Sequence, residues 1–132
     1  MDSSTIELPG SEISGVTIDG ETISVHFQSV IIIKTMAGAF ERTRWRQQGE
    51  LVFEGAQLID DLPSLPAVCS GGDVGENVYT YRNMIPVPLE SRGAAHCDLT
   101  FEDSDQHLRI QAQGVRLDMI DVPKYIEHIA AE

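Results

Sequence analysis

A regular alternation of apolar and polar residues in segment 95–112 constrains the fold of this chain more than any other feature. From Ala95 to Phe101 every second residue is apolar, which is the period of a β-strand with one buried face. The alternation resumes at Leu108, after a polar turn at 103–106. Pairing Phe101 with Leu108 places the apolar residues of both strands on one face, and a slip of one residue would expose them all. The pattern therefore predicts an antiparallel hairpin.

The segment before this hairpin continues the same pattern. Across a turn at 91–94, Val87 would lie opposite Cys97, so the hairpin is expected to extend to a three-stranded meander within 77–117. After Gly114 the apolar phase moves by one residue. A bulge at Gly114 would account for this change, because glycine tolerates the positive φ that one class of bulge needs.

Further strands are predicted upstream. The pair Asp19-Gly20 is a strong signal for a tight hairpin turn and would join a strand at 13–18 to a long strand at 22–35. Residues 30–33 are apolar in both phases, as in a strand that is buried on both faces or crosses between two packed sheets. An amphipathic strand is expected from 42 to about 58.

Together these segments predict an all-β fold. We expect a single domain, in which about six to eight antiparallel strands form a β-sandwich or a flattened β-barrel. Residues 1–11 are expected to fray, and the proline- and glycine-rich residues 60–76 to form a long loop. Asp121 suits a helix N-cap and Pro123 suits the first helical turn, which predicts a short C-terminal helix over 121–131.

The formal net charge of −12 narrows the classes of partner. Such a charge repels phosphate backbones and anionic lipids, so we expect neither nucleic acid nor a membrane surface as a partner. No apolar run reaches the roughly 18 residues that span a bilayer, and the first residues lack the features of a signal peptide. The expected compartment is the cytoplasm, where Cys69 and Cys97 would be free thiols.

Four residues are candidates for catalysis, namely His96, Asp98, His26 and Cys69. The histidine and aspartate residues lie on polar phases of predicted strands, where they could act as acid and base beneath the loop at 60–76. A solvated sheet face with cross-strand charge pairs would look the same. The histidines and cysteines lack the spacing of metal ligands, so no metal and no cofactor is expected.

Two short segments are candidates for binding a ligand or a partner. In the run Ser70-Gly71-Gly72-Asp73, after Cys69, a flexible turn could present backbone amides to an anion or expose the thiol. Arg42, Arg44 and Arg46 alternate along one strand, so their side chains would project together towards a carboxylate or phosphate. They could equally pair with acidic residues of their own sheet.

The sequence contains a coherent core pattern and no catalytic motif, which favours a small binding or accessory protein over an enzyme. The function we rank first is protein–protein interaction, including self-association of a sheet face as a homodimer. An enzyme that uses strand-borne histidine and aspartate residues is the first alternative. A carrier of a small apolar ligand is the second, and it requires a void that Trp45, Phe27, Phe53 and Phe101 do not fill.

Overall fold

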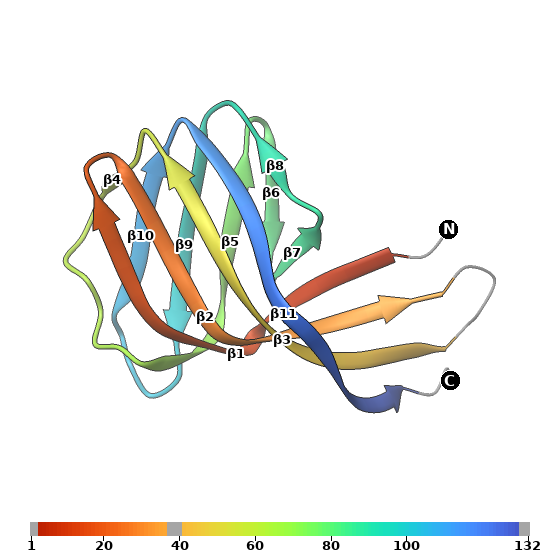
Figure 1. Cartoon of the computed structure of the whole chain (residues 1–132). Helices are drawn as coiled ribbons and strands as arrows, with labels where there is room; N and C mark the ends of the chain where they lie inside the picture. The colour runs from red at the N-terminus through yellow and green to blue at the C-terminus, as the bar shows by residue number, and fades with distance from the viewer. Residues whose placement is uncertain (1–2, 37–40, 130–132) are drawn as a thin grey trace.

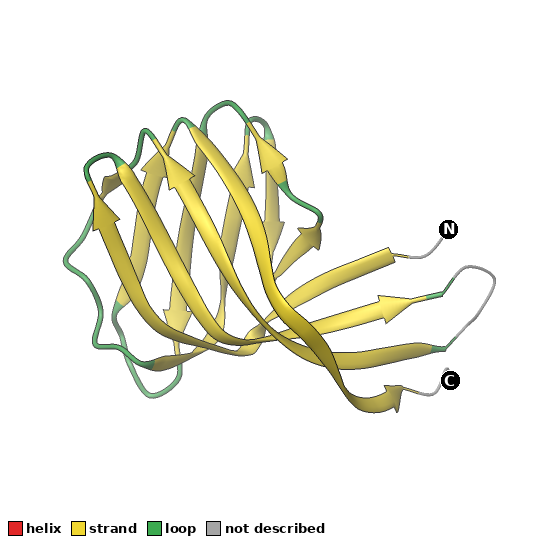
Figure 2. Cartoon of the chain, in the orientation of Figure 1, coloured by secondary structure: helices red, strands yellow, loops and turns green. Residues whose placement is uncertain are grey.

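The computed structural model describes residues 3–36 and 41–129, and this part of the chain consists of strands and loops without a helix (Figure 2). The eleven strands are β1 (Ser3–Asp19), β2 (Thr22–Thr35), β3 (Arg42–Glu54), β4 (Gln57–Leu58), β5 (Ala67–Glu76), β6 (Tyr79–Arg82), β7 (Met84–Val87), β8 (Glu90–Ser91), β9 (Ala95–Phe101), β10 (His107–Ala112) and β11 (Gly114–Ile129). The predicted all-β class is therefore confirmed, with more strands than expected.

The strands form one antiparallel sheet that curls into a half-barrel. Its order is β4-β10-β9-β5-β1-β2-β3-β11-β8, with β6 added to β5 and β7 added to β1. The long strands β1, β2, β3 and β11 make one wall, and β5, β9 and β10 make the wall behind it (Figure 1). Strand β1 joins the walls, because it pairs with β2 along one edge and with β5 and β7 along the other.

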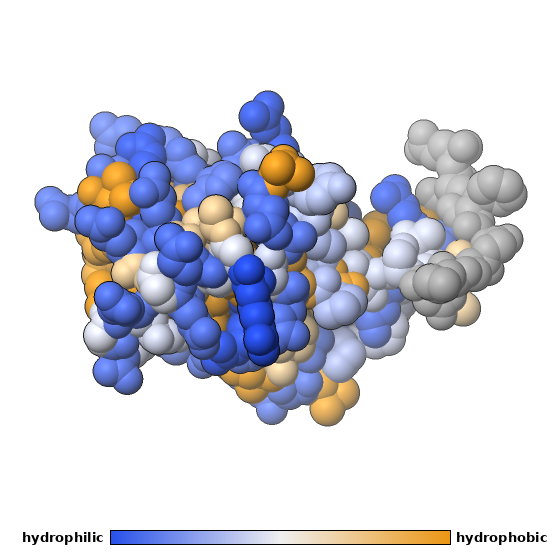
Figure 3. Space-filling view, turned by 90° about the horizontal axis from the view of Figure 1, so that it is seen from above, coloured by the Kyte–Doolittle hydropathy of each residue, from blue (hydrophilic) through white to orange (hydrophobic). Residues whose placement is uncertain are grey.

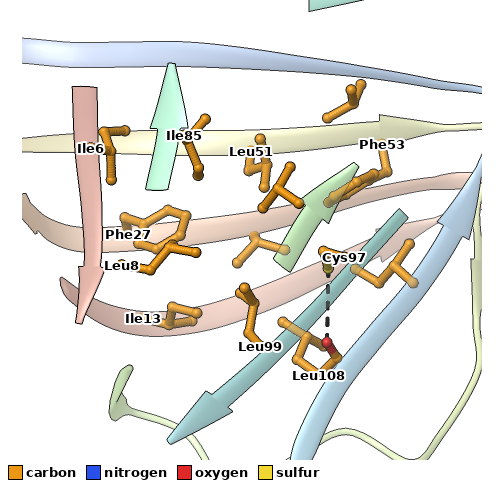
Figure 4. Packing of buried hydrophobic residues seen from close by; sticks show 14 of the residues in the cluster. Ile6, Leu8, Ile13, Phe27, Leu51, Phe53, Ile85, Cys97, Leu99 and Leu108 are labelled. Carbon is orange, nitrogen blue, oxygen red and sulfur yellow. Dashed lines mark hydrogen bonds between the residues drawn. The ribbon is translucent and has the colours of Figure 1, made fainter. Parts of the chain in front are cut away.

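The core lies between the two walls. Alternate residues of β2, β3, β9 and β10 are buried, as expected for strands with one face turned inwards. Figure 4 shows Phe27 and Phe53 of one wall packed in the same cluster as Leu99 and Leu108 of the other. Phe101 belongs to this cluster, and Trp45 packs against it. The side chains of Phe27, Phe53 and Phe101 thus occupy the interior that an apolar-ligand carrier would have to leave open, while Trp45 is partly buried at its margin.

Three long strands carry bulges at the same level, and there the wall bends away from the core. Residues 8–11 of β1 lie opposite a single residue, Val30, and residues 28–29 of β2 lie opposite Gln48. On β11, residues 121–123 lie opposite Gln47. Extra residues increase local twist and bend a strand. Beyond the bend lies a projecting part of the sheet that we call the arm, formed by residues 3–7, 30–35, 42–47 and 124–129 (Figure 1).

The predicted C-terminal helix over 121–131 is wrong for the residues that the structure describes. Strand β11 continues to Ile129 and pairs with β3 as far as Arg42, while residues 130–131 lie outside the described residues. Asp121 has a φ of +64°, so it forms part of a bulge rather than an N-cap. Pairing with a long neighbouring strand has overridden the local helix signals.

The predicted loop at 60–76 is also wrong over most of its length. Residues 67–76 form β5, which lies between β9 and β1 near the middle of the sheet. The predicted fraying of residues 1–11 is likewise wrong from Ser3 onwards. Ile6 and Leu8 are fully buried, and residues 4–7 pair with both β2 and β7.

The hairpin at 95–112 is confirmed, with its register displaced by two residues. Leu99 lies opposite Leu108 rather than Ile110, so the faces are as predicted and the pairs are not. The third strand of the predicted meander is wrong, because β7 pairs with β1 and the outer neighbour of β9 is β5.

The turn predicted at Asp19-Gly20 lies one residue further along the chain, and the bulge predicted at Gly114 is wrong. In the first hairpin Ile18 lies opposite Ile23, so the turn residues are Gly20 and Glu21. At Gly114 the chain leaves β10 and pairs with β3, so a transfer between walls, rather than a bulge, changes the apolar phase.

Candidate functional site

The outer edge of β11 combines exposed apolar side chains with unpaired backbone. Ten large hydrophobic residues are exposed in the described part of the chain, and four of them lie in one seven-residue stretch of this strand, 120–126. These four are Ile120, Val122, Tyr125 and Ile126. Val122 is 76% exposed and Tyr125 is 55% exposed. Exposed apolar residues gathered in one short segment are typical of an interaction surface, whereas single exposed apolar residues are common everywhere.

The edge of β11 is also incomplete as a sheet. One side of the strand pairs with β3 along most of its length. On the other side, among the described residues, Val115 and Arg116 pair with β8 and the Leu117 amide donates to the Leu89 carbonyl oxygen. Among residues 3–36 and 41–129, no strand pairs with the outer side of 124–129. Backbone amides and carbonyls there are available to an additional strand.

An aromatic contact stiffens this edge from within the arm. The rings of Trp45 and Tyr125 meet edge to face with centroids 5.3 Å apart. Lys34 lies on β2, the neighbour of β3 on the side away from β11, and its ammonium is 4.4 Å from the centre of the Trp45 ring. Such contacts each contribute about 0.5–1.5 kcal/mol, so Tyr125 is held in place although it is largely exposed.

The predicted arginine stripe lies on the same arm. Arg44 donates to the Glu127 carboxylate of β11, and Arg46 donates to the Ser29 hydroxyl at 3.3 Å. Their neighbours on β2, Ile31 and Ile33, are buried at 7% and 6% exposure. The first contact is the kind of pairing within the sheet that the sequence left open. Whether Arg42, Arg44 and Arg46 bind a ligand stays a prediction.

His26 lies on the outer face of the front wall, in a row of three polar side chains. Its Nε2 is 2.6 Å from the Thr17 hydroxyl and its Nδ1 is 3.1 Å from a Glu50 carboxylate oxygen. The order hydroxyl, imidazole, carboxylate is that of a nucleophile, its base and an orienting acid. All three residues lie on paired strands, however, so their backbone amides serve the sheet ladder rather than an oxyanion.

Asp98 and His96 lie on the other wall, on the outer face of β9, so the structure does not bring them to His26. Asp98 accepts hydrogen bonds from His107 Nδ1 at 2.6 Å and from Arg109 Nε at 3.2 Å. Partial burial acts to raise the pKa of Asp98, but these two donors outweigh it and hold the pKa below its usual value. The group is thereby kept ionised, which suits an ion pair better than a general acid.

The segment from Cys69 to Asp73 is a strand rather than an exposed turn. Cys69 is buried, and burial raises its pKa to about 12, which opposes a nucleophilic role. Ser70 contacts the Thr100 hydroxyl at 2.9 Å and Asp73 accepts from Arg82 at 3.3 Å. Gly71 and Gly72 lie where β5 runs close to its neighbours. Anion binding here stays a prediction.

Shallow hollows lie along the rim where the loops between the walls meet. The largest on this rim is about 430 Å³ and is bordered by Glu54, Glu90, Arg92 and Arg116. A second, of about 340 Å³, includes His96 and Asn77. The rim face is mostly hydrophilic with small separate apolar patches (Figure 3). Polar, open hollows of this kind are poor sites for an apolar ligand.

The four apolar residues at the edge of β11 were not predicted as a site, because three of them, Val122, Tyr125 and Ile126, fall in the helix predicted over 121–131. The available signal was the two-residue period of Val115, Leu117 and Met119, which indicates that a strand runs up to this segment. The break at 121–123 interrupted that period.

The fold and these surfaces define a small all-β protein with a curled antiparallel sheet and a projecting arm. No protein-family model, no curated protein and no solved structure matches the chain. In the described residues, no group of three or more histidine, cysteine, aspartate or glutamate side chains is placed to hold a metal ion. The same part of the chain offers no helix that could cross a bilayer.

Proposed function

We propose that this protein acts by binding another protein chain through the outer edge of β11. The observation that carries the proposal is the coincidence of four exposed apolar side chains with a strand edge to which no strand of the described residues pairs. Backbone hydrogen bonds to an edge strand supply affinity in this mode of recognition, and the side chains beside it supply specificity.

The arm supports this role mechanically. It projects from the barrel, so a partner can reach the β11 edge without displacing any core element (Figure 1). It is also a continuous sheet, whose members are joined by ladders and by the contacts of Trp45 and Arg44. A rigid presenting surface lowers the entropy lost when the partner binds.

Catalysis is the alternative that a specific observation favours. The row Thr17, His26 and Glu50 has hydrogen-bonding distances suited to an activated hydroxyl. It lies on a sheet face, and an acyl-transfer site would also need donors for the oxyanion. We therefore rank this function second. The cytoplasm remains the expected compartment, with which the free thiols of Cys69 and Cys97 are compatible.

Site-directed photocrosslinking tests the proposed function. A photoreactive phenylalanine analogue would replace Tyr125 in cells that produce the protein, and in a matched variant it would replace Ile18, which is 49% exposed at the far end of the sheet. We expect a discrete crosslinked species from position 125 and none from position 18. Crosslinks at neither position, or equally at both, would contradict the proposal.

A further inference from the structure

We propose that the chain bound at the β11 edge is a second copy of this protein, paired antiparallel with Lys124 of each copy opposite Glu127 of the other. The inference rests on the proposed function and adds the identity and register of the partner. It is carried by the residue order on the edge, by a bulge at Ile126 and by the charges on either side of that bulge.

The bulge places Lys124 and Glu127 on the same face of the arm. Lys124 pairs with Arg46 of β3, and Glu127 pairs with Arg44. The two arginine residues are two positions apart and share a face, so their partners share that face too. In a regular strand Lys124 and Glu127, which are three positions apart, would point to opposite faces. The extra residue, Ile126, removes this difference.

Sharing a face is the condition for contact across a two-fold axis. When two copies of one edge strand pair antiparallel, the two-fold axis is perpendicular to the sheet. Side chains on one face of the first copy therefore lie on the same face as the corresponding side chains of the second copy. An axis passing through the bulge brings Lys124 of one copy opposite Glu127 of the other, and this happens twice. Opposite charges that face one another across an antiparallel pair stabilise it, whereas like charges oppose it.

The same axis brings the apolar side chains together. Tyr125 lies opposite Trp45, so it projects on the face opposite to the charged pair, and Ile126 sits beside it in the bulge. Across the axis, Tyr125 and Ile126 of one copy would meet Ile126 and Tyr125 of the other. Pairing would therefore cover two exposed apolar residues of each copy, 55% and 37% exposed in the single chain.

Edge protection is the competing explanation of these residues. Charged side chains, a proline such as Pro123 and bulges are the features by which proteins prevent unwanted pairing of edge strands. Protection does not call for exposed apolar residues, and it does not call for charges of opposite sign on one face. Both are present at this edge, which favours pairing with a second copy.

Charge exchange between two variants tests the register. In a dimer of the Lys124→Glu variant, a glutamate at position 124 faces Glu127 at both contacts. In a dimer of the Glu127→Lys variant, Lys124 faces a lysine at position 127 at both contacts. We expect each variant alone to dimerise at least about tenfold more weakly than the original protein. An equimolar mixture of the two variants restores both opposite-charge contacts, so we expect it to recover the original affinity as a heterodimer. Sedimentation velocity from about 1 to 500 µM measures all four samples.

Glu127 also accepts from Arg44 of its own chain, so Glu127→Lys could weaken the arm itself. Circular dichroism and the thermal midpoint of each variant check the fold, and Lys124→Glu leaves the Arg44 contact intact. A protein that dimerises equally well with every variant would overturn the proposed register. A protein that stays monomeric throughout would overturn self-pairing. If position 125 still crosslinks to another protein, the proposed function survives that result.

Discussion

Gly72 is a residue at which a single added carbon should disturb the whole sheet. It lies in β5 with a φ of +143°, and a Cβ built there would meet the Asp98 carbonyl oxygen and lie 2.8 Å from the Leu99 Cα. Both contacts are with the backbone of β9, which cannot rotate away. We predict that Gly72→Ala lowers the free energy of unfolding by at least about 2 kcal/mol, measured by urea denaturation.

The matched control for this substitution is Gly15→Ala. No atom lies within 4 Å of a Cβ built at Gly15, and its φ is outside the left-handed region. We expect a change of less than about 1 kcal/mol there. Equal effects of the two substitutions would show that close strand packing is not what requires glycine at position 72.

The two thiols should be unreactive in the folded protein. Burial raises the pKa of Cys69 to about 12, and burial raises the pKa of Cys97 as well. At pH 8 only about one Cys69 in ten thousand would be a thiolate, and the thiolate is the reactive form. We predict that a disulfide reagent titrates no thiol in the native protein and two after denaturation. Rapid reaction of Cys69 in the native state, identified by mass spectrometry of the labelled peptide, would refute its burial in β5.

Asp98 should make stability depend on pH in the acidic range. Its pKa is lower in the folded protein than in the unfolded chain, so ionised Asp98 stabilises the fold at pH values above about 4. This contribution is lost as the pH falls from there through the folded pKa. We predict that Asp98→Asn is less stable than the original protein by up to about 1 kcal/mol at pH 7, and that this difference is smaller at about pH 2.

Urea midpoints at the two pH values measure this difference. Glu102→Gln, an exposed change on the same wall, serves as the control and should alter stability little at either pH. A constant difference between Asp98→Asn and the original protein at all pH values would rule out the ion pair as its cause.

At the scale of single elements, Ser11 holds the bend of β1. Its side chain is fully buried, its hydroxyl donates to the Glu7 carbonyl at 2.6 Å and it accepts from the Ile31 amide at 3.1 Å. Glu7 and Ile31 form the last ladder pair before the bulge, so Ser11 ties the bulge to the regular part of the ladder. We predict that Ser11→Ala costs about 1–3 kcal/mol, because both backbone groups lose a hydrogen-bond partner and the contact with the Ile31 amide is buried.

Hydrogen exchange of the Ile31 amide gives this prediction a local readout, since that amide should exchange faster in Ser11→Ala. Ser14→Ala is the matched control, because the Ser14 hydroxyl donates at 3.2 Å in an exposed position. A loss of stability in Ser11→Ala that equals the loss in the control would contradict the role of Ser11 in the bend.

Elements with a strong local pattern could be predicted from sequence. Strand β2 was expected over its full length, and the burial of residues 30–33 on both faces follows from their continuous apolar character. Strand β5 could not be found in this way, since its glycines are explained only by close neighbours from distant parts of the chain. The end of β11 was misassigned because Asp121 and Pro123 suit a helix start as well as a bulge.

At the scale of the whole molecule, topology was beyond the reach of sequence reasoning. The two-residue period predicts which residues face the core. It does not predict which strands are neighbours, as the pairing of β7 with β1 illustrates. The candidate site depends on that topology, because β11 is an edge strand where β3 is the one strand of the described residues that pairs with 124–129.

Hydrogen exchange at low and high protein concentration tests most directly whether a second copy pairs with this edge. We predict that amides in 124–129 become more protected as concentration rises over about 1 to 500 µM, while those of the short edge strand β4 exchange at a constant rate. Unchanged exchange in 124–129, in a sample whose mass shows that it has dimerised, would contradict pairing through β11.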